Sequence, residues 1–68
     1  MGIQVQLDLE MVKKKMKLND LADEVGITTA NLSRLKNGKV SAIRFSTLEK
    51  ICEVLDCQPG DILIYQKE

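Results

Sequence analysis

The segment LNDLADEVGITTANLSRLKNGK, residues 18–39, carries the clearest pattern in the chain. Its first apolar residues recur at helical spacing, at Leu18, Leu21, Ala22 and Val25. Such a stripe predicts a short amphipathic helix that begins near Lys17. Gly26 follows the stripe, and glycine adopts the left-handed conformation at a helix end without steric cost. The first half of the segment is therefore expected to be a helix that stops at a tight turn.

A second helix is expected directly after this turn. Thr28 offers a hydroxyl group that can cap the first turn of a helix. This helix is expected to run to about Asn37 and to end at Gly38. Ile27 is expected to fill the space beneath the turn.

Four residues have the spacing of a helix-turn-helix motif. Ala22, Gly26, Leu32 and Leu35 stand four, six and three residues apart. In this motif a small residue lets the two helices cross closely, glycine permits the turn, and leucines anchor the second helix on the core. The spacing therefore predicts a helix-turn-helix with its core at residues 17–38.

Both ends of the chain carry short strand patterns. Residues 3–8 alternate between apolar and polar side chains, and a second apolar run extends over residues 62–65. Leu63–Gln66 can pair with Ile3–Leu7, either within one chain or across a dimer. A two-stranded sheet is weak by itself, so it needs helix packing or a partner to persist.

A first helix is expected after the N-terminal strand. Asp8 is expected to cap this helix, because a carboxylate can accept from the free N–H groups of the first turn. Leu9, Val12 and Met16 are expected to form its buried face.

Two further helical segments follow a loop at residues 38–45. Ser46 and Glu49 have the spacing of a capping box, in which each side chain satisfies the backbone N–H of the other residue. The apolar stripe behind them consists of Leu48, Ile51, Cys52 and Leu55. Residues 59–61, with a proline first, are expected to start a last helical turn.

The segment 18–39 resembles the Cro/CI-type helix-turn-helix of the compact Xre-family transcriptional regulators. The resemblance continues through RFSTLEKICEVLDCQPGDIL and covers residues 9–63. It implies an all-α, five-helix, lambda-repressor-like DNA-binding domain formed by the single domain 1–68, here with short terminal β-strands. It also implies that the third helix enters the major groove of double-stranded DNA, usually as a homodimer on a two-fold related site.

The outward face of helix 29–37 is chemically suited to reading base edges. At about 100° per residue, the buried direction lies between its two leucines. The residues that point away from this direction or lie at its edge are Thr29, Ala30, Ser33, Arg34 and Asn37. Arg34 can donate two hydrogen bonds to guanine, and Ser33 can bond to either kind of base edge. Ala30 or Thr29 can meet a thymine methyl group. The alternative is an ordinary solvated helix face, which has the same composition.

The resemblance also implies contacts to the DNA backbone. In the family these come from the start of the second helix, the Asn-Gly after the third helix and the loop that follows it. The corresponding residues here are Lys17, Leu18, Asn37, Lys39 and Arg44, and Thr28 is also expected to contact a phosphate. Leu18 departs from the family's frequent glutamine, so only its backbone amide can make the contact. Asp56 departs from the common glycine after the fourth helix and is expected to sit in a slightly strained left-handed corner.

Composition limits the other functions open to the chain. The chain contains no His and no Trp, and it has one Tyr and one Phe. Without histidine, the chain lacks the commonest general base and the commonest metal ligand. With only two aromatic residues, it lacks a stacking surface for single-stranded nucleic acid. Cys52 and Cys57 lack a zinc-site spacing and are expected to be reduced thiols in a cytoplasmic protein. No enzyme activity, metal, cofactor or small-molecule ligand is expected.

The apolar runs are also too short for a membrane. None of them approaches the roughly 18–20 residues that a transmembrane helix needs. We therefore expect no membrane contact.

The charge of the chain is balanced but unevenly distributed. Ten basic residues offset ten acidic ones, and a net charge of zero argues against a nucleic-acid binder. However, no acidic residue lies between Glu24 and Glu49. This acid-free stretch carries four basic residues: Arg34, Lys36, Lys39 and Arg44. A cationic patch beside the third helix is therefore expected, together with low affinity for non-specific DNA.

The leading hypothesis is a sequence-specific transcriptional regulator, in particular a repressor, because so short a chain has little room for an effector or activation domain. A homodimer is expected, since the apolar terminal strands exceed what so small a core absorbs. The alternative is a protein-interaction module on the same fold, antitoxin-like or a phage-encoded inhibitor. The steep salt dependence of DNA binding separates the two hypotheses.

Overall fold

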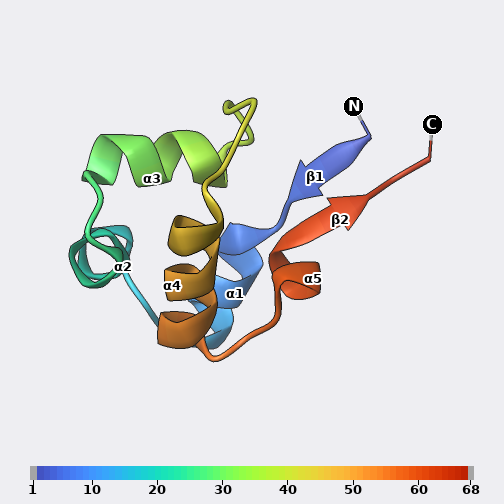
Figure 1. The fold of residues 1–68 in the computed structure, drawn as a ribbon. Helices are drawn as coiled ribbons and strands as arrows, with labels where there is room; N and C mark the ends of the chain where they lie inside the picture. Colours follow the sequence, from blue (N-terminus) through green and yellow to red (C-terminus); the bar gives the residue numbers. More distant parts are fainter. Residues whose placement is uncertain (1, 68) are drawn as a thin grey trace.

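Five short helices and a two-stranded sheet form the fold, in a computed structural model that describes residues 2–67 (Figure 1). The elements follow the order β1 (Ile3–Val5), α1 (Leu7–Lys13), α2 (Leu18–Val25), α3 (Thr29–Lys36), α4 (Phe45–Leu55), α5 (Pro59–Ile62) and β2 (Leu63–Tyr65). The expected five-helix architecture with short terminal strands is confirmed. Within residues 2–67, no helix is both long and apolar enough to cross a membrane.

Every helix contributes to one shared core. The large side chains with no exposed surface are Leu7, Leu21, Leu32, Ile51, Leu55 and Ile62. Each of the five helices supplies at least one of them. Fully burying a leucine or isoleucine side chain stabilises a protein by about 1.5–3 kcal/mol. Helices too short to persist alone are therefore held together by this shared burial.

The helix α2 connects the two sides of the core. It packs against α3 and against α4, while α1 packs against α5. In Figure 1, α3 lies across one end of the molecule, with α2 and α4 on its inner side. No other helix covers the outer side of α3 in that view. The packing therefore leaves one face of α3 uncovered by the other helices.

The two strands pair antiparallel within the chain. Ile3 lies opposite Tyr65, and Val5 lies opposite Leu63. Val5 and Leu63 pack against the helical core, whereas Ile3 and Tyr65 are 58% and 70% exposed. The strands project from the helices (Figure 1), and beyond them the N–H of Gln66 donates to the carbonyl oxygen of Gly2 (2.6 Å). Of the two pairings expected, the intrachain pairing is the one that this structure shows.

The first helix begins earlier than predicted. α1 starts at Leu7 with Gln6 as its N-cap residue, so Asp8 lies inside the first turn. The carboxylate of Asp8 accepts a hydrogen bond from the N–H of Leu9 (3.0 Å) and does not cap the helix. Leu7 ends the alternating pattern of the strand and begins the helical spacing, and this overlap is why the predicted boundary was wrong.

The predicted buried face of α1 is wrong as well. The buried residues of this helix are Leu7, Glu10 and Met11. Leu9 and Val12 are 53% and 74% exposed, and Met16 lies beyond the helix, half-buried against the core. Successive residues of a helix stand about 100° apart, so burial of the side that holds Leu7 and Met11 leaves Leu9 and Val12 on the opposite, exposed side.

The capping box predicted at Ser46 does not form. α4 begins at Phe45 with Arg44 as its N-cap residue, so Ser46 lies within the first turn. The N–H of Leu48 donates to the carbonyl oxygen of Arg44 (3.0 Å) and closes that turn. The apolar stripe of α4 is confirmed, since it supplies the buried residues of this helix. Asp56 ends α4 in the left-handed region (φ 51°), as expected.

Both cysteines are free thiols, half-buried against the core. Cys52 lies on α4, and the N–H of Cys57 donates to its carbonyl oxygen (3.0 Å) just after the helix ends. Burial raises the pKa of the Cys57 thiol to about 11, and the neighbouring Cys52 and Glu10 raise it in the same direction. Cys57 is therefore a neutral thiol at neutral pH.

Candidate nucleic-acid interface

Gly26 forms the turn between α2 and α3. Its backbone lies in the left-handed region (φ 86°, ψ 29°), and its N–H donates to the carbonyl oxygen of Ala22 (2.9 Å). The N–H of Ile27 donates to the same oxygen (3.1 Å). Ala22 is buried, and Ile27 packs half-buried against the core. The roles predicted for these three residues are confirmed, and together they fix the direction in which α3 leaves α2.

The helix α3 is held at its start and along its inner face. The Oγ1 atom of Thr28 accepts from the N–H of Asn31 (3.1 Å), which confirms the predicted N-cap. Leu32 and Leu35 are 0% and 5% exposed and anchor the helix on the core. Asn37 is the C-cap residue, so α3 ends one residue before the predicted limit. Both cap residues are exposed to solvent.

The four residues predicted to read bases all belong to this helix. Thr29, Ala30 and Arg34 are exposed, and Ser33 is half-buried. Of these, Arg34 carries the positive charge and the planar donor group that recognises two acceptors at once. The sequence pattern missed Asn31, which is also exposed. The amide of an asparagine can form hydrogen bonds with two atoms of adenine. The residue type is the only feature of the sequence that could have identified Asn31 as a base reader.

The residues predicted to contact phosphates occupy the ends of the helices. Lys17 and Arg44 are the exposed N-cap residues of α2 and α4. Lys39 is exposed just after α3, where its N–H donates to the carbonyl oxygen of Arg34 (2.9 Å). Leu18 is half-buried against the core, so its side chain is committed to packing. Its backbone N–H remains the group that can reach a phosphate, as predicted.

A hollow of about 510 Å³ lies between α3, the loop that follows it and the start of α4. Asn31 and Arg34 line one side, and Arg44 lines the other. The fold thus brings one predicted base reader and one predicted phosphate contact to the same concave surface. Lys17 and Lys39 do not line it. Its lining residues include no acidic group, so the hollow has the charge that a phosphate backbone requires.

The ion pairs among residues 2–67 involve none of the residues that line this hollow. Lys13 pairs with Glu10 on α1 (3.1 Å), and Lys50 pairs with Glu53 on α4 (3.4 Å). Neither pair uses a basic residue of the acid-free stretch between residues 24 and 49. The four positive charges of that stretch are therefore available to an anionic partner.

Comparison with known proteins agrees with the geometry. Residues 6–68 match the family described as the Cro/C1-type HTH DNA-binding domain. The chain is 56% identical to the uncharacterized HTH-type transcriptional regulator YozG of Bacillus subtilis (strain 168) over 68 residues. The match covers 100% of this chain and 81% of YozG.

Two solved structures share the fold. The transcriptional regulator VanUg matches with a TM-score of 0.74 and 30% identity, over 100% of this chain and 92% of that one. SinR, the master regulator for biofilm formation, in complex with DNA, matches with a TM-score of 0.74 and 24% identity, over 81% of this chain and 87% of that one. The SinR match is a likeness of fold.

Proposed function

The chain belongs to the family of Cro/C1-type HTH DNA-binding domains and is a DNA-binding transcriptional regulator, and we propose that it is a repressor that places α3 in the major groove of its operator. The observation that carries this proposal is the hollow beside α3, whose lining contains Arg34 and Arg44 and no acidic residue. In helix-turn-helix proteins the second helix of the motif lies in the groove, and the residues around it reach the phosphates.

We assign the base contacts to the outer side of α3: Thr29, Ala30, Ser33 and Arg34. The phosphate contacts come from the helix ends and the loop: Lys17, Leu18, Thr28, Asn37, Lys39 and Arg44. Arg34 alone among the four base readers combines a charge with a bidentate donor. Specificity therefore rests mainly on Arg34 and on the shape of the DNA.

Repression is the regulatory role that needs the fewest additional surfaces. A bound domain blocks access to the DNA that it covers, whereas activation requires a contact to another protein. We further propose that residues 1–68 act as one such domain, without catalytic activity or a small-molecule ligand. We also propose a cytoplasmic location, because the relative YozG comes from a bacterium and bacterial DNA lies in the cytoplasm.

Binding selection from a random duplex pool tests the proposal. We expect enrichment of one half-site, with affinity that falls steeply as salt rises, because each neutralised phosphate adds about 0.9 to the salt slope. A pool that shows no enrichment, together with salt-independent retention, would contradict DNA reading. That result would favour the alternative, a protein-interaction module on the same fold, antitoxin-like or a phage-encoded inhibitor.

We propose that the working form is a homodimer that uses the outer end of the sheet. Ile3 and Tyr65 are 58% and 70% exposed there, on a two-stranded sheet with open edges. Sedimentation should give the mass of a dimer for the wild type and of a monomer for Ile3→Lys. Val12→Lys is the matched control, because Val12 is 74% exposed on α1. A monomeric wild type would refute the assignment.

A further inference from the structure

An uncharged hollow lies between the sheet and the loop that follows α3. It has a volume of about 190 Å³, and Ile3, Val5 and Leu63 form its sheet side. Residues 40–43 line it as well, and its lining contains no acidic or basic side chain. A charged group would lose its hydration there without gaining a partner. The hollow therefore fits an apolar or aromatic side chain.

The chain carries such a side chain on the same face of the sheet. Residues directly opposite each other in an antiparallel pair share a face, and alternate residues of one strand do so too. Tyr65 lies opposite Ile3. Ile3 lines the hollow, whereas Tyr65 lies outside its lining and is 70% exposed. The sheet thus presents an exposed aromatic ring beside a hollow that this ring does not fill.

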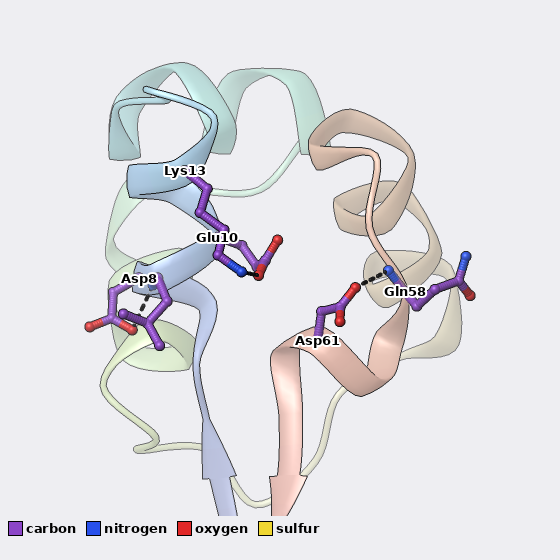
Figure 2. Close-up of polar contacts among 6 residues, drawn as sticks. Asp8, Glu10, Lys13, Gln58 and Asp61 are labelled. Carbon is purple, nitrogen blue, oxygen red and sulfur yellow. Dashed lines mark hydrogen bonds and ion pairs between the residues drawn. The ribbon is translucent and has the colours of Figure 1, made fainter.

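A projecting side chain and a hollow on one face suit a two-fold symmetric contact, in which each copy gives and receives the same residue. The strands leave α1 and α5 side by side (Figure 2), and their sheet has open edges. Ile3 belongs both to the hollow and to the proposed dimer face. On the basis of the proposed homodimer, we propose that Tyr65 of a second copy fills this hollow and thereby fixes the loop 40–43 for DNA binding.

The loop 40–43 connects the hollow to the DNA-facing surface. All of its residues line both this hollow and the one beside α3, and Arg44 follows them directly. Among residues 2–67, no hydrogen bond involves residues 40–43. Val40 and Ile43 hold the loop by packing half-buried against the core. A ring seated against the loop from a second copy would therefore restrict it, and with it the position of Arg44.

Tyrosine fluorescence tests this seat on the unmodified chain, because Tyr65 is the only tyrosine and the chain has no tryptophan. Acrylamide should quench the emission strongly at dilutions that give monomers. Quenching should be weaker at concentrations where sedimentation shows a dimer, because the ring leaves the solvent. A dimer in which Tyr65 is quenched as readily as in the monomer would overturn the seat, whereas a chain that stays monomeric would refute the homodimer itself.

Two variants separate the ring from its hydroxyl group. Tyr65→Ser should dissociate the dimer at concentrations where the wild type is dimeric, and Tyr65→Phe should retain it. Phe45→Ser is the matched control, because Phe45 is 86% exposed and lines neither hollow. Urea unfolding checks that the variants fold. A dimeric Tyr65→Ser, or equal dissociation of Phe45→Ser, would overturn the proposal.

Duplexes with a single half-site test the effect on the loop. Only one domain can read such a duplex, so simultaneous binding of two half-sites does not contribute. The wild type should bind about 3–10-fold more tightly than Tyr65→Ser, the effect of ordering one or two side chains in advance. Affinities within about twofold, which offering two domains explains by itself, would overturn the link to the loop. Failure to bind any duplex would instead refute the proposed function, and the quenching result would still decide the seat.

Discussion

The Oγ1 atom of Thr28 accepts a hydrogen bond of 3.1 Å from the backbone N–H of Asn31, and this contact fixes the first turn of α3. The first N–H groups of a helix lack partners within the helix, so a side-chain acceptor at this position stabilises the whole element. The contact links the turn of the motif to the helix proposed to read DNA.

Loss of this cap should destabilise the fold. Thr28→Ala is expected to lower the free energy of unfolding by about 1 kcal/mol, measured by urea denaturation. Thr28→Ser keeps the hydroxyl group and should retain most of the stability. Thr29→Ala is the matched control, because Thr29 is exposed one residue later. If the Thr28→Ala and Thr29→Ala variants unfold at the same urea concentration, the cap has no energetic role.

Two glycine substitutions should change stability in opposite directions. A Cβ atom would meet nothing within 4 Å at either Gly26 or Gly60, but Gly26 has a φ of +86°. Gly26→Ala should therefore cost about 1–2 kcal/mol through left-handed strain alone. Gly60→Ala, within α5, should stabilise the fold by about 0.5–1 kcal/mol. Thermal unfolding of both variants checks the pair, and equal shifts in Tm would contradict the conformational argument.

Cys57 predicts a loss of stability at high pH. Its pKa rises from 9.0 to about 11 on folding, with burial as the largest cause. Above pH 9 the unfolded chain releases the thiol proton while the folded chain retains it. The stability tied to this thiol is therefore fully present below pH 9 and is lost as pH rises through 11.

The comparison for this prediction is Cys57→Ser, which removes the titrating group. The difference in unfolding free energy between the wild type and Cys57→Ser should shift against the wild type between pH 9 and pH 11. A difference that stays constant over this interval would show that folding leaves the thiol pKa unchanged.

Lys39 should contribute to DNA binding without contributing to base preference. Lys39→Ala is expected to weaken binding to all duplexes alike and to lower the salt slope by about 1, because one phosphate contact is lost. Lys50→Ala is the control, since Lys50 lies on α4 and pairs with Glu53. A Lys39→Ala variant that discriminates among sequences differently from the wild type would assign Lys39 to base reading instead.

Local chemistry explains why the motif could be predicted from sequence. Gly26 and Thr28 act on neighbours a few residues away, and the two leucines of α3 recur at helical spacing, so the spacing alone indicates their roles. The boundary of α1 could not be predicted in this way, because Leu7 satisfies both the strand pattern and the helix pattern. Only burial against the other helices selects between the two.

The candidate sites depend on tertiary packing to different degrees. Most of the proposed DNA face lies on α3 and its flanks, so one short segment was enough to identify it. Arg34 and Arg44 share a hollow because the loop returns beside α3, which no local spacing shows.

Arg34 carries the central claim that α3 reads bases in the major groove. On the best site from the binding selection, Arg34→Ala should cost about 1–3 kcal/mol and relax the preference at one base position while leaving the others intact. Repeating the selection with this variant measures both effects together. Loss of preference at a single position is the predicted result, whereas an unchanged affinity and an unchanged site would contradict this account of how the protein reads DNA.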